Sequence, residues 1–494
     1  MAAQLNLSML QALSGTLARP AYDPRALRAG ILHIGVGNFH RAHQAVYVDD
    51  LLNDGRDRDW AIVGAGLRPA DRAMRAALAG QDWLTTVIEL EPGASRARII
   101  GSMIDFLPVR EDGRAIVAAL DDPGIRIVSL TITEGGYCID PATGAFDLDH
   151  PDIRHDAAHP EMPRGVFGVL VAALKRRRDR GLQPFTVLSC DNLPRNGHVA
   201  WEATAGLADL TDRSLGEYVR KAVAFPDSMV DRITPVTTDR ERARAAAEFG
   251  VADAWPVACE PFRQWVIEDR FPAGRPRLEE VGVTFTPDVA AYELMKLRIL
   301  NGAHAALAYP AALLGIRFVH QAMVDPLVGA FLDRLVTEEI IPALPSVADV
   351  DLGAYWRVVA RRFANPEIED TIARLAMDGS NRQPKFILPS VRDRLKASRD
   401  ISGLALVSAL WCRACAGTTE TGEPLAVDDA MAARLTAAAW AARAAPDAFL
   451  GLRDVFGDLA DAHAFRKAFA AALDALWRSG VRATLASYVQ RTHP

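Results

Sequence analysis

The stretch from Tyr292 to His304 carries residue types that can do acid–base chemistry. It is apolar with helical spacing, and on one helix Lys296, Asn301 and His304 would share a broad face. Polar groups on the inward side of an apolar helix need partners, and a generic core uses Ser or Thr more readily than Lys. Burial lowers the pKa of a lysine, which suits a general base. The alternative to a catalytic cluster is a Lys296 on the surface, with Asn301 and His304 as core residues whose hydrogen bonds are all made within the protein.

These residue types match the needs of alcohol oxidation. That reaction requires a base for the hydroxyl proton, donors for the developing alkoxide and a nicotinamide to take the hydride. Lys296 is the predicted base, Asn301 donates an amide N–H to the alkoxide, and His304 holds a substrate hydroxyl. Asn192 follows the predicted strand 185–189, at the edge of a sheet where ligands bind, and is a second amide donor.

A glycine-rich turn lies between the predicted strand 30–37 and the predicted helix 38–52. Gly35 permits a tight turn, and Gly37 lets the backbone approach a pyrophosphate at the helix N-terminus. The alternative is an ordinary strand-to-helix turn, because a histidine stands where a third glycine is usual. The residues predicted to contact a dinucleotide here are Gly35, Gly37, Asn38, Phe39 and His40.

An acidic residue follows the second predicted strand, 60–64. Dinucleotide enzymes use such a residue to accept hydrogen bonds from the adenosine ribose hydroxyls. Asp71 is predicted to do this and to favour NAD, because its charge repels a 2′-phosphate, whereas Arg68 could hold one. A helix N-cap at Asp71 is the alternative.

Three histidines near the glycine turn raise the possibility of a metal site. His40 and His43 are three apart, and His33 lies upstream. A zinc site needs three or four ligands, and no acidic residue stands at a suitable spacing. We therefore expect no bound metal.

The sequence pattern changes near residue 285. Before it, strands at 30–37, 60–64, 126–133 and 185–189 alternate with helical segments, which predicts a parallel sheet covered on both faces. Beyond it, alanine- and leucine-rich segments have helical spacing: 289–314, 325–341, 352–363, 368–376, 404–416, 430–445 and 463–479. The sequence predicts an α/β, Rossmann-type doubly wound domain over 1–285 and a mostly α-helical substrate-binding domain over 286–494.

Composition excludes several classes of partner. The net charge of −6 gives no positive field for nucleic acid. The longest apolar segment, near 302–316, is too short for a bilayer. Five cysteines make no disulfide framework, and the N-terminus lacks a signal-peptide pattern, so we expect a cytoplasmic protein with a small-molecule partner. The oligomeric state stays open, a monomer included.

The chain resembles the polyol-specific long-chain dehydrogenases over nearly its whole length. The motifs that carry the resemblance are Gly35-x-Gly37-x-Phe39-His40-Arg41-Ala42-His43-Gln44, Ser129-Leu-Thr-Ile-Thr-Glu134-Gly-Gly-Tyr137-Cys138, Ser189-Cys-Asp-Asn192, Val230-Asp231-Arg232-Ile233, and Met295-Lys296 with Leu300-Asn301-Gly302. Gly-Leu-Arg68 with Asp71, Glu134-Gly-Gly-Tyr-Cys-Ile-Asp140 and Arg317-Phe-Val-His320 are similar to the mannitol dehydrogenase branch.

The resemblance implies a metal-independent enzyme that moves a hydride between NAD and C2 of a polyol/ketose pair, with D-mannitol/D-fructose as the leading pair. It implies that Lys296 is the general base, that Asn192 and Asn301 form the oxyanion hole, and that His304 orients the substrate. The further residues that it implies are Asp231, Arg374 and Arg382 in the polyol pocket, and Glu134 and Glu293 in proton exchange with solvent.

Two departures from the family pattern leave specificity open. Ala70-Asp71 stands where an acidic pair is usual, which weakens the exclusion of NADP. Arg382 stands where lysine is usual, and an extra cation would suit the carboxylate of fructuronate or tagaturonate. The sequence is also compatible with a dehydrogenase of arabinitol or glucitol, and with a catalytically silent dinucleotide-binding module. The silent module would not need Lys296.

Overall fold

The computed structural model describes residues 2–10, 17–110, 112–140 and 144–491. It separates into two compact units, Met1–Ala290 and Ala291–Pro494, where the sequence prediction placed the boundary at residue 285. Each unit is described by itself below.

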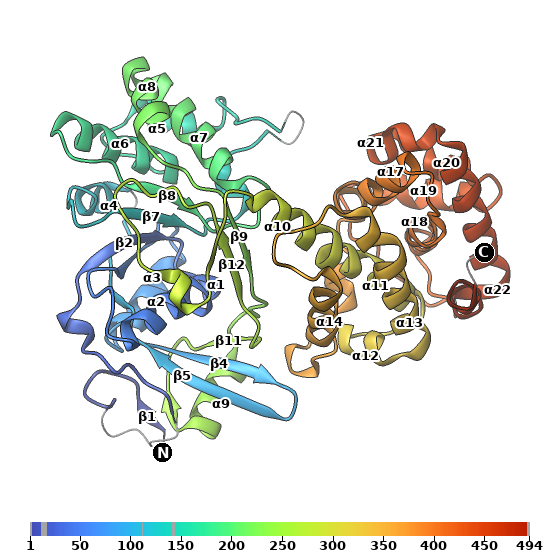
Figure 1. Ribbon diagram of the computed structural model, residues 1–494, viewed down its shortest axis with the longest axis horizontal. Helices are drawn as coiled ribbons and strands as arrows, with labels where there is room; N and C mark the ends of the chain where they lie inside the picture. The colour runs from blue at the N-terminus through green and yellow to red at the C-terminus, as the bar shows by residue number, and fades with distance from the viewer. Residues whose placement is uncertain (1, 11–16, 111, 141–143, 492–494) are drawn as a thin grey trace. The chain divides into compact units, whose positions relative to one another are not determined.

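The first unit is built on a five-stranded, all-parallel sheet in the order β6-β3-β2-β7-β8 (Figure 1). The strands are β2 (Ala29–Ile34), β3 (Ala61–Ala65), β6 (Met103–Phe106), β7 (Ile127–Leu130) and β8 (Thr186–Ser189). Four of them were predicted, and β6 was not. The predicted Rossmann-type fold is confirmed.

Both faces of this sheet are covered, because successive strand residues point to opposite sides. Ile127 packs with α1 (Asn38–Ala42) and α2 (Gln44–Asn53), whereas its neighbour Val128 packs in a second core. That second core contains α4 (Arg114–Ala119), α6 (Val166–Asp179) and α7 (Asn196–Thr211). The two sets of helices lie on opposite sides of the sheet in Figure 1. The continuous apolar runs in the strands follow from this double burial.

Smaller strand groups complete the first unit. One sheet has the order β11-β4-β5, another has β13-β12-β9, and β1 pairs with β10. Their strands are β1 (Ala3–Gln4), β4 (Thr85–Glu91), β5 (Ala94–Ile100), β9 (Ser228–Asp231), β10 (Val251–Ala252), β11 (Val257–Cys259), β12 (Gln264–Ile267) and β13 (Thr284–Phe285). The remaining α-helices here are α3 (Asp71–Ala79), α5 (Pro151–Ala158), α8 (Arg213–Ala222) and α9 (Asp239–Phe249).

The second unit is mostly helical, as predicted. Its α-helices include α10 (Val289–Met295), α11 (Gly302–Leu313), α12 (Val319–Val324), α13 (Pro326–Arg334), α14 (Leu352–Phe363), α15 (Ile372–Ala376), α16 (Gly379–Arg382), α17 (Leu388–Lys396), α18 (Ser402–Cys415), α19 (Ala432–Ala442), α20 (Asp447–Leu450), α21 (Arg453–Phe456) and α22 (His463–Gln490). Three π-helical turns interrupt them: η4 (Lys296–Asn301), η5 (Leu335–Ile340) and η8 (Gln383–Ile387). The predicted helix 289–314 is therefore two α-helices joined by a π turn.

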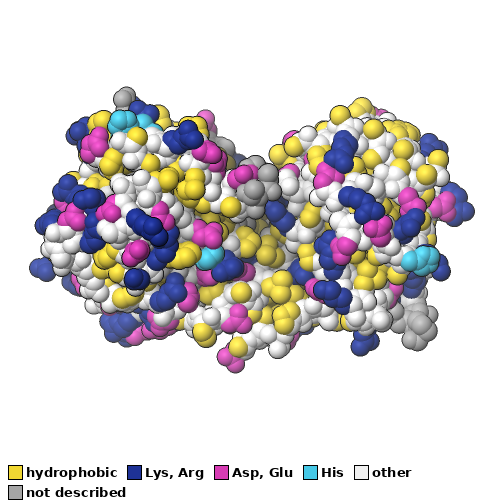
Figure 2. Space-filling model, turned by 90° about the horizontal axis from the view of Figure 1, so that it is seen from above, with side chains coloured by type: hydrophobic (Ala, Val, Ile, Leu, Met, Phe, Trp, Pro, Cys, Tyr) yellow, Lys and Arg dark blue, Asp and Glu magenta, His cyan; other side chains and the backbone are white. Residues whose placement is uncertain are grey.

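The surface carries charges of both signs. Lys and Arg alternate with Asp and Glu on the face of each unit seen in Figure 2, so that face has no single-sign field of the kind that attracts nucleic acid. Among the helices of the described ranges, none combines the length and apolar character needed to traverse a bilayer.

Candidate active site

The glycine turn after β2 leaves room for a ligand. Gly35 has φ +100°, and a Cβ there would collide with the carbonyl oxygen of Thr131, so glycine is required. A Cβ on Gly37 would approach only the Gly35 carbonyl oxygen, at 3.8 Å. Gly37 is also the N-cap of α1 and supplies no side-chain cap. The turn therefore fits a pyrophosphate bound by backbone N–H groups.

The predicted helix 38–52 is wrong in its continuity. It breaks at His43, where φ is −123° and ψ is −87°, between α1 and α2. The break turns the His43 ring onto Phe39, with 4.7 Å between ring centroids, and places Nε2 2.9 Å from the Gln264 carbonyl oxygen. The tertiary contact with β12 overrides the helical pattern here, and it positions Phe39.

Asn38 and His40 contribute to the scaffold of the turn. Asn38 Nδ2 donates to the Pro235 carbonyl oxygen and to Thr237 Oγ1, both at 2.9 Å. His40 is fully buried and stacks on His33, with 3.5 Å between ring centroids. A side-chain contact of either residue with a cofactor stays a prediction.

The histidines near the turn are packed as neutral rings. His33 Nδ1 lies 2.8 Å from Ser129 Oγ, Nε2 lies 2.9 Å from Thr131 Oγ1, and burial lowers the pKa of His33 to about 3. Burial likewise lowers the pKa of His43 to about 3. Across the described part of the chain, no three His, Cys, Asp or Glu side chains are arranged to hold a metal ion.

Asp71 lies beyond the carboxyl end of β3, next to the strand that leads into the glycine turn. It is the first residue of α3, and Ala70 is the N-cap, so the alternative that Asp71 caps this helix is wrong. Instead Asp71 Oδ2 accepts a hydrogen bond from the Arg68 amide at 3.0 Å. The Arg68 guanidinium is 3.6 Å from the other carboxylate oxygen and is 70% exposed. Recognition of the adenosine ribose by Asp71 and Arg68 stays a prediction.

Asn192 and Glu134 lie on two loops that one carboxylate joins. Asn192 is exposed and follows β8, and exposed Glu134 begins a short 3₁₀ turn after β7. Between them, the buried Asp191 carboxylate accepts hydrogen bonds from the amides of Ile132 and Thr133. Asn192 and Glu134 therefore share a support.

Asp231 ends β9 and is 6% exposed. The next residue, Arg232, is also buried and donates to the Glu260 and Ala42 carbonyl oxygens at 2.9 and 2.6 Å, and to Glu89 Oε1 at 2.6 Å. Arg232 therefore fastens the end of β9 to α1 and β4, which fixes the position of Asp231.

In the second unit, Lys296 is buried and begins the π turn η4, which Asn301 ends. On an α-helix, residues five apart diverge by about 140°. A π turn instead bonds residue i to i+5, which stacks them. The π turn therefore places Lys296 and Asn301 on one face, as predicted, more closely than an α-helix would. The alternative of a surface lysine is wrong, because Lys296 is only 8% exposed.

His304 lies just beyond the π turn, on α11. Its ring stacks on Phe363, with 3.9 Å between ring centroids and 12° between planes. Nε2 is buried and has no hydrogen-bond partner among the described residues. Burial, followed by the charges of Arg374 and Arg362, holds the pKa of His304 well below its usual value. A neutral ring with an unpaired nitrogen fits a ligand hydroxyl.

The two arginines predicted for the polyol pocket lie together near His304. Arg374 is paired with Asp370 through Nε at 2.7 Å. Arg382 donates to the Leu375 carbonyl oxygen at 2.8 Å and to that of Arg374 at 3.5 Å. Their charges, with that of Arg362, act on His304. The structure thus brings three of the predicted substrate-side residues together in this unit.

Sequence reasoning missed Arg362 and Phe363. Both are buried at the end of α14, after the buried Tyr355, Trp356 and Val359. The available signal was Arg362, a charged residue at an apolar position of the helix. Burying a charge is costly, so a buried arginine indicates a partner or a function at that place.

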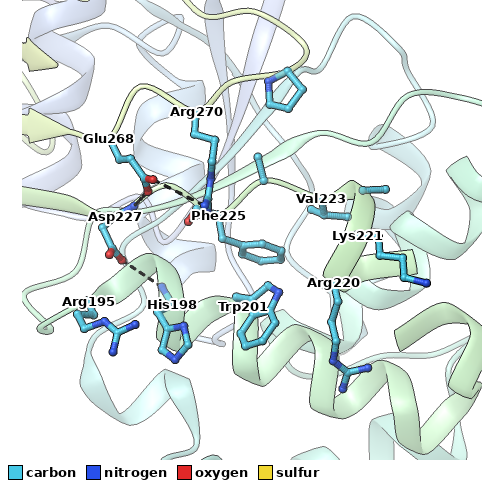
Figure 3. Close-up of a pocket in the computed structure, with 13 residues that line it drawn as sticks. Arg195, His198, Trp201, Arg220, Lys221, Val223, Phe225, Asp227, Glu268 and Arg270 are labelled. Carbon is cyan, nitrogen blue, oxygen red and sulfur yellow. Dashed lines mark hydrogen bonds and ion pairs between the residues drawn. The ribbon is translucent and has the colours of Figure 1, made fainter. Parts of the chain in front are cut away.

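A separate pocket of about 560 Å³ lies in the first unit between α7, α8 and the ends of β9 and β12 (Figure 3). Its described lining contains none of the predicted site residues. Three of its side chains pair with acids: Arg270 lies 3.7 Å from Glu268, Arg220 is paired with Asp209, and His198 Nε2 is 3.1 Å from Glu202.

The Rossmann unit with an open glycine turn, and the helical unit with a buried lysine on a π turn, define a nicotinamide-dependent dehydrogenase. Residues 29–280 match the model of the mannitol dehydrogenase Rossmann domain, and residues 288–477 match that of the mannitol dehydrogenase C-terminal domain. The chain belongs to the mannitol dehydrogenase family, which confirms the family indicated by the motifs.

Relatives and solved structures agree over the full length. The chain is 56% identical to mannitol 2-dehydrogenase of Cereibacter sphaeroides, over 97% of this chain and 100% of that protein. The Pseudomonas fluorescens mannitol 2-dehydrogenase ternary complex with NAD and D-mannitol matches with TM-score 0.85 and 42% identity, covering 99% of this chain and 100% of that one. A D-sorbitol dehydrogenase in substrate-free form matches with TM-score 0.91 and 35% identity, covering 97% and 100%.

Proposed function

We propose that the protein transfers a hydride between NAD and C2 of a polyol/ketose pair, D-mannitol and D-fructose, without a metal ion and with Lys296 as general base. One observation carries this proposal: Lys296 is buried on a π turn of the helix that also bears Asn301 and His304. The relative solved with NAD and D-mannitol supports the choice of cofactor and substrate.

The first unit supplies the cofactor contacts. Gly35, Gly37 and the amides that open α1 hold the pyrophosphate, and Asp71 accepts hydrogen bonds from the adenosine ribose hydroxyls. Asp71 disfavours a 2′-phosphate, while the exposed Arg68 moderates that preference. When bound, NAD supplies the hydride acceptor for polyol oxidation.

The protein's own side chains manage the proton and the negative charge. Burial disfavours the charged form of an amine, so Lys296 is suited to take the proton of the C2 hydroxyl. Asn192 and Asn301 donate amide N–H groups to the oxygen on which charge develops. His304 Nε2 and the side chains of Asp231, Arg374 and Arg382 hold the remaining hydroxyls.

The proton taken by Lys296 must reach solvent. Glu293 is on α10, three residues before Lys296, which begins η4, and Glu293 is partly exposed. Glu293 therefore accepts the proton from Lys296, and the exposed Glu134 exchanges protons with solvent.

Two other candidate substrates have support of their own. The match to a D-sorbitol dehydrogenase favours D-glucitol, and the arginines around His304 would suit a uronate carboxylate. The test is a screen of D-mannitol, D-glucitol, arabinitol and fructuronate with NAD(H) and NADP(H). We expect the highest kcat/KM for D-mannitol with NAD; a higher value for fructuronate would replace the proposal with a uronate reductase.

A further inference from the structure

The loop after β7 contains a backbone conformation that threonine rarely adopts. Thr133 has φ +64° and ψ 165°, and the 3₁₀ turn Glu134–Tyr137 begins directly after it. For a β-branched residue this φ is strained, and such strain persists only where the surroundings enforce it. The enforcing contacts must lie close to Thr133.

Those contacts converge on Asp191. Its Oδ1 accepts a hydrogen bond from the Thr133 amide at 2.9 Å, and its Oδ2 accepts from the Ile132 amide at 3.0 Å and from the Tyr137 hydroxyl at 2.8 Å. The Asp191 carboxylate and these three donors are here called the Asp191 clamp. The clamp holds Thr133 through its own amide and through groups on both sides of it in the chain, Ile132 and Tyr137. It therefore determines the position of Glu134.

The main chain of Asp191 is fixed as firmly as its side chain. Its carbonyl oxygen accepts from Asn196 Nδ2 at 3.0 Å and from the Leu193 amide at 2.9 Å. Asn196 is fully buried and also donates to the Ser228 carbonyl oxygen at 2.8 Å, at the start of β9. The Leu193 contact closes a turn around Asn192, so the position of Asn192 also depends on Asp191.

We propose that Asp191 is a positioning residue, whose carboxylate holds the strained Thr133–Glu134 turn and whose main chain holds Asn192. The inference rests on the proposed function, in which Asn192 donates to the alkoxide and Glu134 exchanges protons. Both groups need accurate placement, and a displacement of about 1 Å can cost about 10²-fold in rate. The clamp therefore acts on the rate of the reaction, through two residues that contact the reactants.

The test begins with Asp191→Asn. Asparagine keeps the shape but turns an amide NH₂ toward N–H or O–H donors, so the clamp loses acceptors without leaving a cavity. We expect kcat for mannitol oxidation to fall about 10²-fold, with KM for mannitol and the Kd of NADH changed less than about threefold. Asp227→Asn is the matched control, since Asp227 Oδ1 also accepts from one backbone amide, that of His198 on α7, at 3.1 Å.

A rescue separates positioning from general destabilisation. Glycine adopts positive φ without strain, so Thr133→Gly in the Asp191→Asn background should recover about tenfold of the lost kcat. Hydrogen exchange at the Ile132 and Thr133 amides should quicken in Asp191→Asn and stay unchanged in Asp227→Asn. If Asp191→Asn does not fold, Tyr137→Phe removes one bond of the clamp, and a fall in kcat at unchanged KM supports the proposal.

Several results would overturn the inference: wild-type kcat in Asp191→Asn or in Tyr137→Phe, an equal loss in Asp227→Asn, or no recovery with Thr133→Gly. The proposed function fails by a different result, namely a wild-type protein that does not oxidise a polyol with NAD. In that case amide exchange still tests the clamp, because unchanged protection of Ile132 and Thr133 in Asp191→Asn would refute it.

Discussion

The ring of His304 lies flat against that of Phe363, with 3.9 Å between the centroids and 12° between the planes. Stacking fixes the plane of the imidazole and therefore the direction of Nε2, the nitrogen with no partner among the described residues. Burial keeps this ring neutral, since the pKa of His304 is held well below its usual value.

We expect His304→Ala to lower kcat/KM for mannitol about 10- to 100-fold, mostly through KM, because a hydrogen bond to a substrate hydroxyl is lost. The Kd of NADH should stay unchanged. The pH profile of kcat/KM above pH 6 should keep its shape, because His304 does not titrate there. Steady-state kinetics at several pH values would check this, and a lost ionisation in the profile would contradict the neutral role.

Lys296→Ala should lower kcat about 10²- to 10⁴-fold, the range that a general base contributes. NADH binding, followed by fluorescence, should change little. Lys396→Ala is the control, because Lys396 is an exposed lysine at the end of α17. Retention of activity by Lys296→Ala would favour the catalytically silent dinucleotide-binding module.

Asp71→Ala should reduce the preference for NADH over NADPH by about tenfold, since charge-assisted hydrogen bonds to the ribose are lost and repulsion of a 2′-phosphate is removed. The ratio of kcat/KM with the two cofactors measures this. An unchanged ratio would mean that the adenosine end is recognised by other residues.

Exhaustive chelation should leave activity intact. The assay compares protein dialysed against a strong chelator with untreated protein, and the metal content of both is measured. A loss of activity that zinc restores would refute the metal-independent mechanism.

The contribution of His33 to the free energy of unfolding should fall as pH is lowered from 7 to 5. The pKa of His33 is about 3 in the folded protein, while an unfolded histidine titrates near 6.5, so the unfolded state binds the extra proton in this range. The stabilisation that neutral His33 gives the folded state is fully present above the pKa of the unfolded histidine. About 2 kcal/mol of the free energy of unfolding is lost by pH 5.

Urea unfolding of wild type and His33→Asn would isolate this effect. The buried carboxyls Asp49, Asp191 and Glu339 have pKa values raised by burial, so they act in the opposite sense, but they are common to both proteins. The slope of unfolding free energy against pH should be smaller in the variant, and identical slopes would count against a neutral His33.

Much of the fold follows from sequence pattern alone. The helix predicted at 352–363 matches α14, because its buried residues recur with helical spacing. The hairpin of β4 and β5 was missed, although its run of β-branched residues and the Pro92-Gly93 turn were visible.

The site was only partly accessible from sequence. Lys296, Asn301 and His304 could be placed on one helix from residue type and spacing. The π turn and the break at His43 could not, since both lie against elements distant in the chain. Phe363 was missed because aromatic stacking on a histidine has no local pattern.

The π turn also makes the number of residues in this helix matter. A π turn accommodates one residue more than an α-helix over a similar path. Deleting one residue within 297–300 would restore regular α-helical winding, with Lys296 and Asn301 then four residues apart on one face. In the regular helix α11, by contrast, a deletion rotates the following residues by about 100°. The π turn should therefore tolerate the loss of one codon better than α11 does.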